Sequence, residues 1–294
     1  FNFFNCTPEW WSNINTSIRD GARFAATLGN VEVEAAATVE SSAGCGCAYP
    51  DYVPDEFVNR SNAIVSRLRQ AAHAEPLSTG AKGVLEWLRS LPMAITVSIG
   101  DDAMRLALLH GDPDSLAGWG LAAESVDVPD SALRRSLGCS ADGQVTSRQQ
   151  LLKWFADSGV SAFLSAHTCL PWAQDLHISP HEHQRYFHGA AYSSHLVIFN
   201  NGAAGLPNFR GTQHGLITRV SADLDVPADS VYGLSASGVR FDAIPLQYDN
   251  EAWLRKFTSV WHEGSAAHIS YHERMMQGPE YEIWQAMRGS VQLG

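Results

Sequence analysis

Apolar residues recur along the chain at two spacings, one typical of helices and one typical of strands. Phe57, Ile64, Val65 and Leu68 lie on one approximately helical stripe, which predicts an amphipathic helix over residues 55–72. Other segments with capping residues or helical spacing predict further helices over residues 9–23, 79–91, 115–125, 131–137, 146–158 and 250–276.

Alternation of apolar and polar residues predicts the strands. Ile95, Val97 and Ile99 alternate with polar residues, and the run at 105–109 returns as the second strand of a predicted hairpin. Between the later strands, residues 173–194 are predicted to form a polar, histidine-rich loop. The remaining strands are expected over residues 160–164, 196–199, 212–222 and 231–247. Because strands and helices alternate, the pattern favours an α/β fold or a two-sheet sandwich with outer helices.

Side chains that bind metals follow three of the apolar runs. The segments are Leu28-Gly29-Asn30, Leu109-His110-Gly111 and Ala166-His167-Thr168-Cys169. In an extended backbone, His167 and Cys169 point to the same side. Ligand sites in α/β sheets gather at the carboxyl ends of strands. The three segments therefore predict one convergent site built from distant parts of the chain.

Composition narrows the classes of function. The 294-residue chain carries a formal net charge of −11, which argues against a general nucleic-acid surface. An acidic protein that handles phosphates needs a local source of positive charge, and a metal ion supplies one. Five cysteines show no disulfide framework, so we expect a reducing, cytoplasmic environment. No apolar run is as long as a membrane span, so no membrane partner is expected.

The order of these motifs resembles the later half of the calcineurin-like metallophosphoesterase signature, D-x-H, G-D, G-N-H-[DE], H, G-H-x-H. The resemblance covers about residues 25–222 and includes the turn at residues 200–205. It implies a four-layer sandwich, in which two β-sheets are flanked by helices. The chain opens at Phe1, so we expect the amino-terminal strands with D-x-H and G-D to be missing. Residues 1–240 would form the domain, and residues 241–294 an extension packed on it.

The resemblance also implies a set of metal ligands. Asn30 would bind the second metal through its amide oxygen, and His110 and His167 would bind the same ion. Cys169 stands where the family has the last histidine, which binds the first metal. Two divalent ions (Zn, Fe or Mn) would hold a bridging hydroxide that attacks a phosphomonoester or phosphodiester. Asn30 and His110 are the expected catalytic residues, and the substrate is a small or macromolecular phosphoester.

Two departures from the family pattern keep alternatives open. Val31 replaces the histidine of G-N-H and cannot transfer a proton, and Cys169 is a softer ligand than histidine. One alternative is a catalytically degenerate relative that acts as a binding or regulatory module. Another is a hydrolase that uses Cys169 as its nucleophile, assisted by a nearby histidine.

Other candidate residues have both a structural and a functional interpretation. Cys45-Gly46-Cys47 lacks a second pair at zinc-finger spacing, so a loop with two thiols is favoured. Arg210 either contacts a phosphate or lies on a surface turn, and Asp112 either orients His110 or forms a turn. The predicted loop also carries histidines that are either solvated or part of a substrate flap: His177, His181, His183, His188 and His195.

Overall fold

The computed structural model describes residues 7–37, 46–74, 79–100, 104–127, 131–140, 143, 145–187 and 193–294. The expectations for Phe1, Cys45 and His188, and for the hairpin turn at Asp101, lie outside these residues. The chain divides into two compact units, one formed by Phe1–Ala94 with Tyr248–Met276 and the other by Ile95–Gln247 with Gln277–Gly294.

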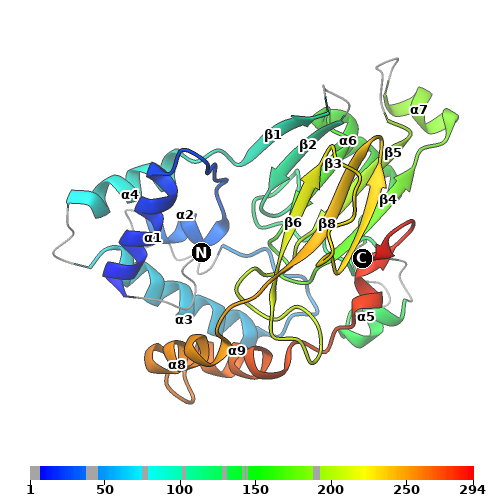
Figure 1. The fold of residues 1–294 in the computed structure, drawn as a ribbon. Helices are drawn as coiled ribbons and strands as arrows, with labels where there is room; N and C mark the ends of the chain where they lie inside the picture. The colour runs from blue at the N-terminus through cyan, green and yellow to red at the C-terminus, as the bar shows by residue number, and fades with distance from the viewer. Residues whose placement is uncertain are drawn as a thin grey trace. The chain divides into compact units, whose positions relative to one another are not determined.

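The first unit is helical in the part that the structure describes (Figure 1). Its α3 helix (Asp55–Ala72) confirms the predicted amphipathic helix, because Ile64, Val65 and Leu68 are buried. Arg67 places its guanidinium 4.3 Å from the ring centroid of Trp261. The other helices of this unit are α1 (Pro8–Asp20), α2 (Asn30–Ala36), α4 (Thr79–Ser90), α8 (Asn250–Val260) and α9 (Ala266–Gln277). Among the described residues, none of the helices combines the length and apolar character needed to cross a membrane.

The second unit is mixed α/β and contains two sheets. The first has the order β1-β2-β3-β5-β4-β9, and the second has the order β10-β7-β8-β6. The first sheet consists of β1 (Ala94–Ile99), β2 (Met104–Leu109), β3 (Ala162–Ser165), β4 (Trp172–His177), β5 (His195–Asn200) and β9 (Met287–Arg288). The second consists of β6 (Gly215–Ser221), β7 (Tyr232–Ala236), β8 (Val239–Leu246) and β10 (Gln292–Leu293). The helices of this unit are α5 (Ala132–Ser136), α6 (Arg148–Ser158), α7 (Pro180–Tyr186) and the 3₁₀ helix η1 (Ile283–Ala286).

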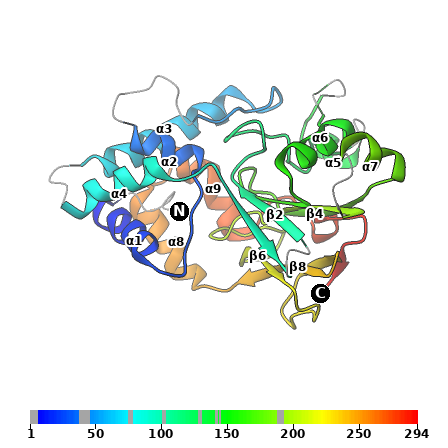
Figure 2. The same ribbon diagram turned by 90° about the horizontal axis from the view of Figure 1, so that it is seen from above.

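Aromatic contacts hold the layers of this unit together. Phe199 on β5 packs with its ring centroid 5.7 Å from that of Tyr232 and 6.4 Å from that of Phe241, both on the second sheet. On the other face of the first sheet, Phe155 of α6 lies 4.5 Å from Phe163 of β3 between centroids. Figure 2 shows α5, α6 and α7 on the side of the first sheet that is away from β6 and β8. Helices, first sheet and second sheet are therefore successive layers.

Parallel pairing aligns the ends of three strands. Leu106 on β2 is paired with Ala162 on β3, and Ser165 on β3 is paired with Asn200 on β5. Parallel strands run in the same direction, so their carboxyl ends meet at one edge of the sheet. This edge carries the candidate site. Arg240, at the predicted domain boundary, lies inside β8, and the division into residues 1–240 and 241–294 stays a prediction.

The predicted loop at residues 173–194 was wrong, because much of it is regular structure. Strand β4 pairs antiparallel with β5 and buries Trp172 and Leu176, while Gln174 and Asp175 remain partly exposed. Helix α7 follows, with a capping box between Ser179 and Glu182. The polar residues that suggested a loop belong to a partly exposed strand and to the cap of a helix.

The predicted helix at residues 115–125 was also wrong, because this segment forms successive turns. The carboxylate of Asp112 accepts hydrogen bonds from the backbone N–H groups of Asp114, Ser115 and Gly120 at 3.0, 2.8 and 2.9 Å. An aspartate that captures nearby backbone donors offers the chain an alternative to a helix.

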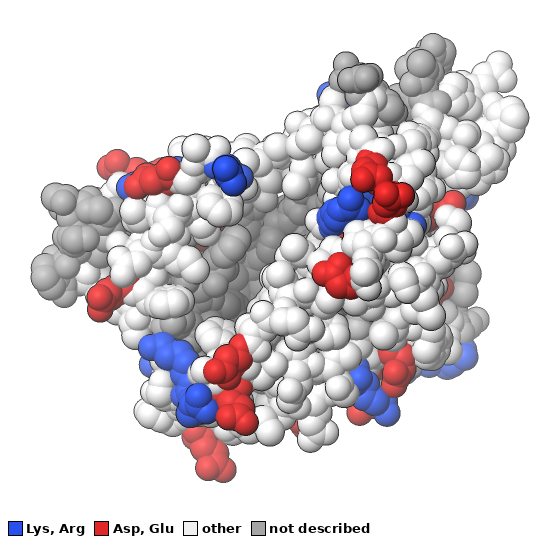
Figure 3. All heavy atoms as spheres, viewed as in Figure 1, with Lys and Arg blue, Asp and Glu red and all other residues white. Residues whose placement is uncertain are grey.

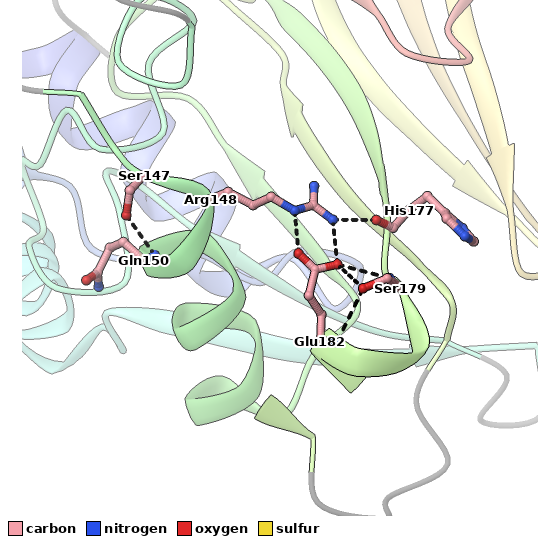
Figure 4. A network of polar contacts seen from close by, with 6 residues as sticks. All are labelled: Ser147, Arg148, Gln150, His177, Ser179 and Glu182. Atoms are coloured by element: carbon pink, nitrogen blue, oxygen red, sulfur yellow. Dashed lines mark hydrogen bonds and ion pairs between the residues drawn. The ribbon is translucent and has the colours of Figure 1, made fainter. Parts of the chain in front are cut away.

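A network of polar contacts joins α6 to α7 (Figure 4). Arg148 donates to both carboxylate oxygens of Glu182, at 2.6 and 3.0 Å, and to the carbonyl of His177. Glu182 also accepts from the backbone and hydroxyl of Ser179. Arg148, and then the Ser179 backbone, lower the pKa of Glu182 to about 2. The network stabilises the connection between the end of β4 and the start of α7.

A fully buried carboxylate lies in the second sheet. Asp242 accepts from Arg240 at 2.8 Å, from Arg219 at 3.0 Å and from Ser230 at 3.1 Å. The side chain of Arg240 is only 8% exposed, so loss of Asp242 would leave a buried guanidinium without its main partner. Removing one member of a buried ion pair is far more costly than removing an exposed one.

We expect Asp242→Ala to lower the free energy of unfolding by about 3–5 kcal/mol, as measured by urea denaturation. Asp157→Ala is the matched control, because the side chains of Lys153 and Asp157, which form an ion pair, are each 60% exposed. The control should change stability by less than about 1 kcal/mol. Equal effects of the two variants would show that the Asp242 network does not stabilise the sheet.

Candidate functional site

Two histidines that are distant in sequence meet at the carboxyl ends of β2 and β3. His110 follows β2 directly, and the backbone N–H groups of Ala166 and His167 donate to the His110 carbonyl at 3.2 and 2.9 Å. Nδ1 of His167 lies 3.0 Å from Nε2 of His110. The ring centroids are 4.8 Å apart and the ring planes are inclined at 61°. The structure thus brings together two of the predicted ligands.

Partial burial disfavours the charged form of both imidazoles. It lowers the pKa of His110 to about 4 and, together with the neighbouring His110, lowers that of His167 to about 3. The ring of Trp119 packs edge-on against His167, with centroids 5.7 Å apart. Nε2 of His167 is buried, and a hydrogen bond between the His167 ring and the Ala117 backbone opposes part of the lowering of its pKa. A neutral imidazole is the form that binds metals.

The loop after His110 holds Trp119 in place. Asp112 accepts the backbone N–H groups of this loop, including that of Gly120, the residue next to Trp119. A Cβ added to Gly118 would lie 1.9 Å from the Asp112 carboxylate, so only glycine fits there. Asp112 therefore shapes the loop that covers His167, and its carboxylate bonds to backbone groups rather than to His110.

Polar side chains that sequence reasoning missed complete this edge. Asn200, the last residue of β5, donates from Nδ2 to the hydroxyl of Thr168 at 2.9 Å. Ser165 ends β3, and its buried hydroxyl oxygen has no hydrogen-bond partner in the described part of the chain. The available signal was the polar pair Asn200 and Asn201 directly after an apolar run. It was assigned only to a turn.

Cys169 lies two residues beyond His167 in an unusual backbone conformation. Its φ of 58° is in the left-handed region, which is uncommon for a residue with a side chain. Its thiol donates to the His167 carbonyl at 3.5 Å. Within the described ranges, no three His, Cys, Asp or Glu side chains are grouped closely enough to hold a metal ion. The role of Cys169 as a ligand stays a prediction.

Asn30 belongs to the other unit and begins a helix there, where a strand end was expected. It is the first residue of α2, with Gly29 at the N-cap position. Its side chain is buried, and Nδ2 donates to the thiol of Cys47 at 3.1 Å. This bond engages the amide nitrogen, whereas the predicted metal ligand is the amide oxygen. The assignment of Asn30 to the metal site stays a prediction.

Arg210 and the histidines His177 and His195, the other candidates, contact charged or aromatic neighbours. Arg210 forms ion pairs with Glu280 and, at 3.1 Å, with Glu282, so its predicted phosphate contact would compete with two carboxylates. His195 pairs with His177 across β4 and β5, with ring centroids 5.2 Å apart. On the face shown in Figure 3, basic and acidic side chains of the described residues occur in small mixed groups.

The comparisons with known proteins are distant. No family model matches the chain, and no curated protein matches it by sequence. A hypothetical protein from Pyrococcus horikoshii OT3 is 13% identical, with 93% of this chain and 80% of that chain covered and a TM-score of 0.47. A metallophosphoesterase from Sphaerobacter thermophilus is 14% identical, with 91% and 82% covered and a TM-score of 0.42. Both likenesses are too distant to assign this chain to a family.

The partly buried histidine pair should make stability fall in mild acid. Both pKa values in the folded protein lie below the ordinary value of 6.5, so the unfolded chain takes up these protons first. The contribution of the neutral histidines to the free energy of unfolding is complete above about pH 6.5. It is lost as the pH falls toward the folded-state pKa values, about 4 for His110 and about 3 for His167. Each histidine contributes a slope of roughly 1.4 kcal/mol per pH unit in this window.

Urea denaturation between about pH 5 and 7 measures this slope. The double variant His110→Gln/His167→Gln should show a much shallower dependence than the wild type. The exposed His177 provides the control, and His177→Gln should keep the wild-type slope. An unchanged slope in the double variant would contradict neutral burial of the pair.

Proposed function

We propose that this chain is a metal-dependent phosphoesterase that hydrolyses a phosphomonoester or phosphodiester. The observation that carries the proposal is the meeting of His110 and His167. These residues are 57 positions apart, follow adjacent parallel strands and place two ring nitrogens 3.0 Å from each other. Their order with Gly29-Asn30 and Ala166-His167-Thr168-Cys169 supports the same function, through the resemblance described above.

The donor atoms at this edge fit the chemistry of one soft divalent ion. Neutral imidazole suits Zn and Fe, and a thiolate at Cys169 would favour the same metals. The buried hydroxyl of Ser165 has no hydrogen-bond partner in the described part of the chain. A ring nitrogen that binds a metal must carry its lone pair, and the tautomer of each histidine decides which nitrogen that is.

The protein groups around the pair have distinct tasks in this proposal. His110 and His167 would hold the ion, and the ion when bound would neutralise phosphate charge and activate water. The His110 carbonyl fixes the backbone of His167 through an N–H bond of 2.9 Å. Trp119 packs against the His167 ring and limits its movement. Phosphoryl transfer depends mainly on such positioning and on electrostatic stabilisation.

The finer parts of the proposal rest on the resemblance. We propose two ions, with Asn30 as a ligand and catalytic residue, Cys169 as a ligand and Arg210 as a weaker candidate for phosphate binding. The corresponding fold would be a four-layer sandwich, and the cytoplasmic location remains part of the proposal. The substrate class is any small or macromolecular phosphoester.

A degenerate binding module is the second candidate. Two observations favour it: Val31 occupies the position of the family's proton donor, and His110 and His167 have no third His, Cys, Asp or Glu grouped with them among the described residues. Such a protein would bind metal without hydrolysing esters. Measurements of metal content and turnover on one sample separate the two candidates.

We expect the purified protein to contain a divalent metal and to hydrolyse bis(p-nitrophenyl) phosphate or p-nitrophenyl phosphate. Chelation should abolish turnover, and Zn, Mn or Fe should restore it. His167→Ala should lower both metal content and kcat/KM at least about tenfold, because even outer partners of metal ligands cost this much. Elemental analysis and a colorimetric assay provide the two readouts.

His177→Ala is the matched control and should keep both properties, because its side chain is exposed. Bound metal without turnover would favour the binding module. Loss of activity on thiol alkylation, together with indifference to chelators, would instead favour Cys169 as a nucleophile.

A further inference from the structure

The orientation of the Asn200 side chain is determined by a backbone group. The N–H of Gly202 donates to Oδ1 of Asn200 at 2.9 Å. A backbone N–H can only donate, so the atom that faces Gly202 must be the amide oxygen. The amide nitrogen consequently faces the hydroxyl of Thr168, at 2.9 Å. Asn200 is only 1% exposed, so this orientation is enclosed by the fold.

This arrangement dictates how Thr168 can use its hydroxyl. The Nδ2–H of Asn200 occupies a lone pair of the threonine oxygen, and the threonine proton must point elsewhere. Within the described residues, the bond from Asn200 is the hydrogen bond that Thr168 makes. Thr168 is partly exposed and directly follows His167. The hydroxyl is therefore a donor at the carboxyl end of β5, in the residue that follows His167, and its proton points away from Asn200 toward any incoming acceptor.

We propose that Thr168 is a substrate-binding residue that donates this hydrogen bond to a non-bridging oxygen of a phosphate group. The identification of the acceptor rests on the proposed function. Phosphate oxygens at neutral pH are strong acceptors, and hydrogen bonds to charged groups are stronger than neutral ones. Asn200 is the positioning residue, because it acts on the ligand only through the direction of the Thr168 hydroxyl.

The pair offers an unusually direct test of hydrogen-bond direction. Thr168→Val removes the hydroxyl while nearly keeping the shape, and Thr168→Ser retains it. Asn200→Asp replaces the donor with an acceptor. One carboxylate oxygen would still accept from Gly202, and the other would accept the Thr168 proton, which turns the hydroxyl away from the ligand.

The experiment titrates inorganic phosphate into the purified protein by calorimetry, with equal metal content across variants. Thr168→Val should weaken phosphate binding roughly ten- to hundredfold, the range expected for a hydrogen bond to a charged group. Asn200→Asp should show a similar loss, and Thr168→Ser should remain within about threefold of the wild type. Thermal unfolding identifies any variant that does not fold. If Asn200→Asp does not fold, the comparison of Thr168→Val with Thr168→Ser still tests the role of the Thr168 hydroxyl.

Hydrolysis of p-nitrophenyl phosphate is measured on the same samples, so that the two proposals can fail separately. If the wild type binds phosphate through Thr168 but hydrolyses nothing, the binding role stands and the proposed function falls. If the wild type hydrolyses the ester and Thr168→Val binds phosphate as tightly as the wild type, the binding role is overturned. Absence of phosphate binding in the wild type also overturns it.

Discussion

Parallel pairing of β2, β3 and β5 is the constraint on which the candidate site depends. Each strand ends in polar residues that are unremarkable alone, and the register places these ends at one edge. Strand β5 makes this possible because Leu196, Val197, Ile198 and Phe199 are all fully buried. A strand covered on both faces has a strongly specified position. The candidate site therefore takes its geometry from a fully buried strand of the second unit.

The same edge contains a buried polar group that no described residue partners. An unpartnered buried donor or acceptor costs about 1–3 kcal/mol, and such groups in a native structure call for an explanation. The hydroxyl of Ser165, two residues before His167, is such a group. A bound ligand at this edge would satisfy it, which supports a functional site there.

The sequence predicted features that depend on a single residue type at a defined position, such as a histidine directly after an apolar run. The meeting of His110 and His167 could be predicted because each follows an apolar run, while their role as ligands stays a prediction. Helix α3 could be predicted from its apolar stripe. Sequence reasoning failed where local polar bonds compete with periodicity. Asp112 captures three backbone N–H groups and prevents the predicted helix.

The role proposed for Thr168 and Asn200 could not be predicted from residue types. It follows from a chain of bonds that begins at the Gly202 backbone and ends at a hydroxyl proton. Asn30 shows a different limit, because the motif that named it as a ligand says nothing about its bond to Cys47. Spacing identifies candidate ligands, and only coordinates show which of their atoms are engaged.

Anomalous X-ray diffraction from crystals of the zinc-loaded protein tests the central claim most directly. The proposed metal site predicts a metal peak about 2.0–2.1 Å from a ring nitrogen of His167, with His110 beside it. A zinc peak elsewhere, with the bond between His110 and His167 intact and no metal at this edge, would show that the histidine pair is not a metal site.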